Sequence, residues 1–90
     1  MKREKVYEVI NGERSYQDSK WGNTLSSGRP GNGERSIDEF ALYISGYSDK
    51  LKANASEFGD PIAKLDIVRK VAALYVACME QHGAVKREGF

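Results

Sequence analysis

The sequence predicts a small all-α protein, a single domain spanning residues 1–90 that contains three helices. Apolar residues recur at spacings of three or four in three separate segments, which is the period of a half-buried helix. Capping signals stand at the starts of the second and third segments. Between the first two segments, residues 22–35 hold four glycines and a proline, a composition that predicts a long, flexible loop. The second and third helices should then form a helical hairpin.

The first helix, expected over residues 3–21, changes character along one face. Read at helical spacing, that face begins with Val6 and Ile10 and continues with Glu13, Gln17 and Trp21. Burying polar groups without partners costs about 1–3 kcal/mol each. These side chains should therefore either pair inside the fold or contact a ligand.

The second helix begins at a capping box, in which Ser36 and Glu39 satisfy each other's backbone amides. It should continue to about residue 56. Its apolar positions form one continuous stripe: Ile37, Phe40, Ile44, Tyr47 and Leu51.

The third helix is bounded by Asp60 as N-cap, Pro61 at the first helical position, and Gly83 at its end. One of its faces carries Leu65, Val68, Ala72, Tyr75 and Met79, and another carries Ile67, Val71, Leu74 and Cys78. Two partner helices cannot easily cover so much apolar surface. We therefore expect a homo-oligomeric bundle built on this helix, followed by a polar tail at 84–90.

Composition excludes several classes of protein. The net charge is +1 with acids and bases interspersed, which argues against general nucleic-acid binding and against a membrane-surface protein. The single Cys78 has no partner for an intramolecular disulfide and no neighbour at zinc-ligand spacing. No apolar run approaches the roughly 20 residues of a membrane span, and the N-terminus lacks a signal-peptide pattern. A cytoplasmic protein is expected.

Catalytic patterns are weak. His82 is the only histidine, and no nucleophile motif accompanies it. The segment 28–33 resembles a phosphate-binding loop but lacks the following Lys-Ser/Thr and the preceding strand. We therefore expect neither a catalytic residue nor a metal site or cofactor, and a binding protein rather than an enzyme.

Aromatic and charged residues near the end of the first helix indicate a binding site. Tyr16 and Trp21 offer stacking surfaces, Gln17 can read a base or ribose edge, and nearby cations can contact phosphate. The candidate ligand-binding residues are Glu13, Arg14, Tyr16, Gln17, Lys20, Trp21, Arg29 and Arg35. This mixture suits a nucleotide-like ligand. In the alternative interpretation, Trp21 anchors the loop to the core, and Glu13 and Arg14 pair with other helices.

The string at 13–22, ERSYQDSKWG, together with KVAALYVACME at 70–80, resembles small uncharacterised proteins of tailed bacteriophages. A weaker similarity extends to MazG-like all-α nucleoside triphosphate pyrophosphohydrolases. That resemblance implies magnesium-dependent hydrolysis and a dimeric or tetrameric helical bundle. The metal motif of the family is Glu-Glu-x-x-Glu on one helix, which this sequence lacks, with a further acidic pair on the next helix, which Glu57 and Asp60 mimic.

Three hypotheses for function follow. The first is a non-catalytic phage-type binder that sequesters a nucleotide-like small molecule, as an anti-defence sponge for a cyclic nucleotide or an ADP-ribose-derived signal. The second is a diverged magnesium-dependent pyrophosphohydrolase of the MazG-like kind. The third is a phage structural or partner-inhibiting protein. The missing carboxylate cluster favours binding over hydrolysis.

Overall fold

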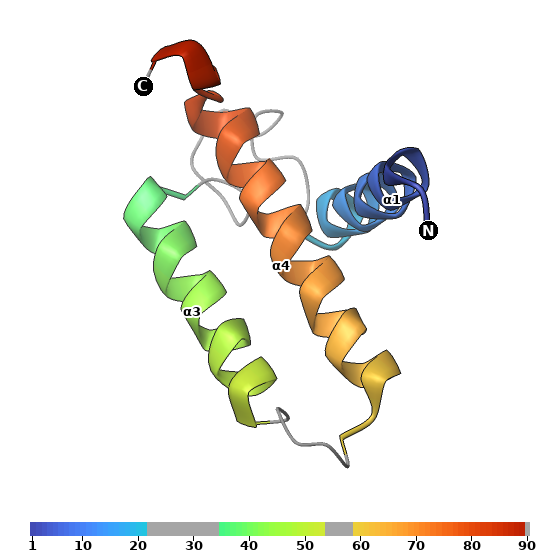
Figure 1. Cartoon of the computed structure of the whole chain (residues 1–90). Coiled ribbons are helices and arrows are strands. Elements are labelled where there is room, and N and C mark those ends of the chain that lie inside the picture. Colours follow the sequence, from blue (N-terminus) through green and yellow to red (C-terminus); the bar gives the residue numbers. More distant parts are fainter. Residues whose placement is uncertain (22–34, 54–58, 90) are drawn as a thin grey trace.

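Three long helices make up most of the described part of the chain, so the predicted all-α class is confirmed (Figure 1). The computed structural model describes residues 1–21, 35–53 and 59–89. Helix α1 spans Arg3–Trp21, α3 spans Ile37–Ala53 and α4 spans Pro61–His82, and a short 3-10 turn, η1, follows at Arg87–Gly89. The predicted loop 22–35, except Arg35, lies outside the described residues, as do positions 54–56 of the second predicted helix.

The helix boundaries follow the capping signals. The backbone N–H of Ser36 donates to Glu39 Oε1 at 3.0 Å, and Glu39 N–H donates to Ser36 Oγ at 3.0 Å, which confirms the capping box. At the start of α4, Asp60 Oδ1 accepts from Ile62 N–H at 2.9 Å. Gly83 ends α4 with a φ of 102°, a conformation that side chains other than glycine rarely adopt.

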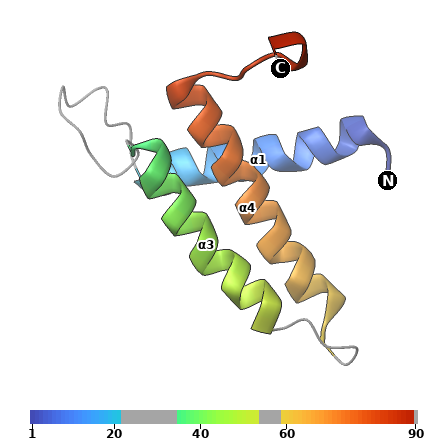
Figure 2. The ribbon, with the colours of Figure 1, turned by 60° about the vertical axis from the view of Figure 1, so that its left-hand side comes forward.

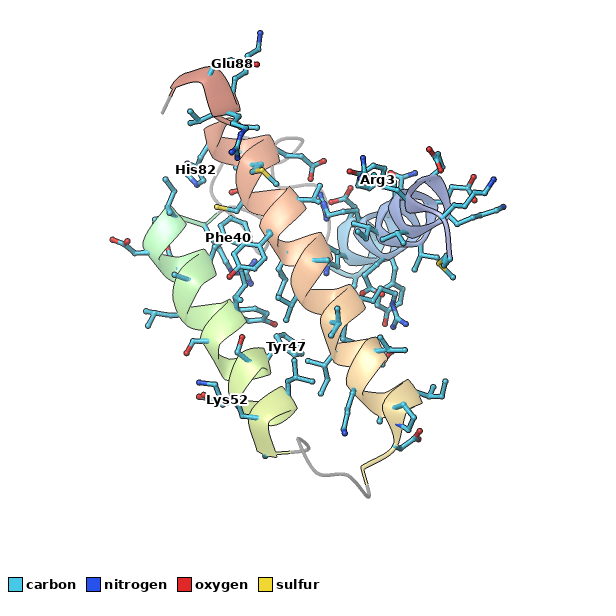
Figure 3. The ribbon with its side chains drawn as sticks, viewed as in Figure 1. Arg3, Phe40, Tyr47, Lys52, His82 and Glu88 are labelled. Carbon is cyan, nitrogen blue, oxygen red and sulfur yellow. The ribbon has the colours of Figure 1, made fainter. Side chains whose placement is uncertain are left out.

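Helices α3 and α4 form the predicted helical hairpin and hold the apolar core between them (Figure 1). The buried cluster consists of Phe40 and Ile44 from α3 with Leu74 and Ala77 from α4. Tyr47, Val71 and Cys78 pack against its margin. In Figure 3 the rings of Phe40 and Tyr47 both point from α3 into the space between the two helices. The third-helix face carrying Leu74 therefore belongs to the core, and a charge there would disrupt the fold itself rather than a subunit contact.

Helix α1 crosses α4 at a steep angle on a different side from α3 (Figure 2). Among the described residues, α1 contacts α4 but not α3. Its N-terminal half projects past α4, and there Val6, Tyr7 and Val9 are exposed. Helix α4 is thus the element on which both other helices pack.

Within the described residues, no helix combines the length and the apolar character required to cross a membrane.

Candidate functional site

The polar stretch of α1 lies against α4. The Glu13 carboxylate is buried, and its Oε1 accepts from Arg69 Nε at 2.8 Å. Arg69 also donates through Nη2 to Asp66, which in turn pairs with Lys70 Nζ at 3.0 Å. A connected set of four charges therefore joins the two helices, and Glu13 is the member contributed by α1.

Arg14 makes a second set of contacts between the same helices. Its Nε donates to Glu80 Oε2 at 2.6 Å, and its Nη2 donates to Asp18 Oδ1 at 2.8 Å. Its Nη1 donates to Gln17 Oε1 at 3.2 Å, and the side chain is only 12% exposed. All three guanidinium nitrogens are thus engaged within the chain, one of them across the α1–α4 interface.

Gln17 is the most deeply buried polar residue of α1 among those described. Besides accepting from Arg14, it donates through Nε2 to the backbone carbonyl of Lys70 at a long 3.5 Å. Ala73, which is fully buried, lies one turn after Arg69 and Lys70 on the same side of α4. The small side chain at that position leaves room for α1 to approach.

The electrostatics of these groups reflect their pairing. Partial burial opposes the charged form of Arg14, but hydrogen bonds to Glu80 and Asp18 outweigh it and raise the guanidinium pKa. The hydrogen bond to Asp66 raises the pKa of Lys70. Hydrogen bonds from Lys70 and Arg69 lower the pKa of Asp66. Each of these shifts reflects stabilisation of the charged form by an oppositely charged partner, on the same helix for Asp66 and Lys70 and on both helices for Arg14.

Two of the other predicted residues are exposed. Tyr16 and Lys20 lie one turn apart on the outward surface of α1, and the Tyr16 side chain is 59% exposed. Trp21 ends α1, but its side chain lies outside the described residues, as does Arg29. The structure therefore packs Glu13, Arg14 and Gln17 of α1 against α4 and leaves Tyr16 and Lys20 facing solvent.

Arg35 lies where the start of α3 meets the end of α4. Its backbone N–H donates to Gln81 Oε1 at 3.0 Å, and its carbonyl oxygen hydrogen-bonds His82 Nε2 at 2.7 Å. Its guanidinium lies over the Tyr43 ring, 4.9 Å from the centroid. The His82 ring meets Phe40 edge-on at a centroid distance of 6.3 Å. In Figure 3 both side chains lie between α3 and the end of α4. His82 thus links the end of α4 to the start of α3.

Sequence reasoning missed the α4 half of this arrangement. Arg69 and Glu80 were not predicted as site residues, although they bind Glu13 and Arg14, which were. A signal was present, because Arg69 and Lys70 follow Asp66 by three and four residues, the spacings at which side chains pair on a helix. Within the described residues, no three His, Cys, Asp or Glu side chains gather in a way that could hold a metal ion. Glu57 lies outside them, and Asp60 serves as the N-cap of α4.

Comparison with protein-family models, with curated proteins and with solved structures finds no match to this chain. The resemblance to bacteriophage proteins and to MazG-like pyrophosphohydrolases therefore stays a prediction.

Proposed function

We propose that the chain is a non-catalytic binding protein and that its ligand is a nucleotide-like small molecule. The observation that supports this ligand class is the exposed pair on α1, in which a phenol ring and a lysine ammonium lie one turn apart. An aromatic face stacks on a nucleobase, and a cation beside it attracts phosphate. The ring of Tyr16 and the charge of Lys20 supply this combination at the surface.

Within this proposal, we assign ligand contact to the exposed residues of α1. Glu13, Arg14 and Gln17 already have partners on α4 or on their own helix. Their role in this proposal is to hold α1 against α4. Tyr16 and Lys20 are the residues that contact ligand in this proposal. Arg35, like the three residues that hold α1 against α4, already has a partner, because its guanidinium lies over the Tyr43 ring of α3.

The biological role that goes with this proposal is sequestration. A binder without turnover lowers the free concentration of its ligand, so a phage protein of this kind would act in the host cytoplasm as a sponge for a cyclic nucleotide or an ADP-ribose-derived signal. This role rests on the bacteriophage resemblance of residues 13–22 and 70–80. The diverged pyrophosphohydrolase is the competing proposal.

Native mass spectrometry with ATP, cyclic di-AMP and ADP-ribose as probes tests the proposal. We expect at least one probe to bind and to be recovered intact after heat denaturation. Tyr16→Ala and Lys20→Ala should each weaken binding about tenfold, the loss of one stacking or ionic contact. Tyr7→Ala is a matched control, because Tyr7 lies on the same helix and is 62% exposed.

Two results would contradict the proposal. If no probe binds at millimolar concentration, the ligand class is wrong. If pyrophosphate is released in proportion to protein in the presence of magnesium, the chain is an enzyme and the competing proposal holds.

A further inference from the structure

Helix α4 has three faces, and the helices that the structure describes cover two of them. Successive helical residues are rotated by about 100°, so residues three and four apart share a face. One face carries Asp66, Arg69, Lys70 and Ala73 toward α1, and a second carries Val71, Leu74 and Cys78 toward α3. The third face consists of Leu65, Val68, Ala72, Tyr75, Val76 and Met79. We call these six residues the open face of α4.

The open face is apolar over its whole length. Leu65, Val68, Tyr75 and Met79 are exposed, and Ala72 and Val76 between them are half-buried. No charged residue interrupts the face from Leu65 to Met79, a helix length of roughly 21 Å at 1.5 Å per residue. A continuous exposed apolar strip of this kind marks an interaction surface.

The molecule exposes more surface than a compact chain of its size. The chain exposes 7093 Å², whereas a compact monomer of 10.0 kDa exposes about 5,200 Å². Its radius of gyration is 14.7 Å, against about 12 Å for a compact chain of 90 residues. Each partner buries approximately 800 Å² in a stable interface, and the extended surface of this chain leaves room for an interface of that size.

We propose that the open face of α4 docks on the same face of a second copy of this chain, in an antiparallel two-fold dimer. The distribution of side-chain size along the face suits such an axis. Ala72 lies at its centre, with Val68 and Leu65 on one side and Tyr75 and Met79 on the other. Antiparallel pairing about Ala72 places Val76 against the partner's Val68 and Met79 against the partner's Leu65, and the small Ala72 allows the two helices to approach closely.

This inference is independent of the proposed ligand, since it uses none of the residues assigned to ligand binding. It also assigns the subunit contact to a different face of α4 from the one that carries Leu74. The absence of charge along the face favours an identical apolar partner, because neither copy then leaves a charged group buried and unpaired.

Light scattering coupled to size exclusion tests the dimer at micromolar concentration. We expect the wild type to have twice the chain mass of 10.0 kDa. Tyr75→Glu should raise the dimer Kd at least a hundredfold and give a monomer whose helical circular dichroism is retained, because the Tyr75 side chain is 54% exposed and outside the core cluster. Leu42→Glu is the matched control, since Leu42 is 75% exposed on α3 and should leave the dimer intact.

Cross-linking tests the two-fold axis separately. In a Cys78→Ala background, Ala72→Cys should form an intermolecular disulfide on mild oxidation, because the axis brings the two copies of this position together. Leu42→Cys in the same background should not cross-link. A wild-type monomer at 100 µM, or a Tyr75→Glu variant that remains dimeric, would overturn the proposal. Loss of the dimer in Leu42→Glu would place the interface elsewhere and overturn it as well.

Discussion

Replacing Arg14 with alanine tests whether the polar stretch of α1 holds the fold together. The substitution removes charge-assisted hydrogen bonds to Glu80 at 2.6 Å and to Asp18 at 2.8 Å. Each such bond contributes about 1.5–3 kcal/mol when it is shielded from water. Both carboxylates are more than half exposed and regain water when Arg14 is lost, so we expect a net cost of about 2 kcal/mol. In a domain of this size, that cost lowers Tm by roughly 8–16 °C.

Thermal unfolding followed by circular dichroism measures this effect, and a double-mutant cycle with Glu80→Ala isolates the contact between helices. We expect a coupling of about 1 kcal/mol between Arg14 and Glu80, since the pair is partly exposed. Lys5→Ala is the control, because the Lys5–Glu8 pair is exposed on both sides and within one helix. If the Tm of Arg14→Ala lies within about 2 °C of wild type, these contacts do not support the fold and the reasoning fails.

Three further predictions concern other parts of the chain. Gly12→Ala should stabilise the protein by about 1 kcal/mol, because a Cβ there meets no atom within 4 Å; a drop in the urea midpoint would contradict this. Leu74→Ala should cost roughly 2–5 kcal/mol, since Leu74 is buried between α3 and α4, and urea unfolding at unchanged m-value measures it. Hydrogen bonds from Ser36 lower the pKa of Glu39 below its ordinary 4.5, so the stability that this contact provides is present above about pH 4.5 and is lost as pH falls through the lowered folded value. Glu39→Gln should therefore flatten the acid limb of Tm against pH, and an unchanged limb would refute the assignment.

The helices could be predicted from the sequence because their signals are local. The Ser36–Glu39 box and the Asp60–Pro61 start each act within a few residues, and the structure confirms both boundaries. The apolar stripe of α3 correctly identified Phe40 and Ile44 as buried. Capping depends on hydrogen bonds within one helical turn, and the stripe depends on helical periodicity, so neither requires knowledge of the rest of the fold.

The pairing of the helices could not be predicted in the same way. Glu13 and Arg69 are 56 residues apart, and nothing local to either one specifies the other. The sequence established that the polar groups on α1 needed partners, and left open whether a ligand or another helix would supply them. In the structure, Glu13, Arg14 and Gln17 all have protein partners. The prediction of a ligand contact rests on Tyr16 and Lys20, whose side chains are exposed.

The contrast between the two contacts of α4 has a consequence for folding kinetics. The α3–α4 hairpin joins helices that are close in sequence, and burial of apolar side chains stabilises it. Helix α1 instead docks on α4 through polar groups that are distant in sequence. Local contacts form at a lower entropic cost, so we expect the hairpin to be formed in the transition state and α1 to dock afterwards. Leu74→Ala should then slow folding, while Arg14→Ala should mainly accelerate unfolding. Under mild destabilisation, α1 would therefore leave α4 before the hairpin opens.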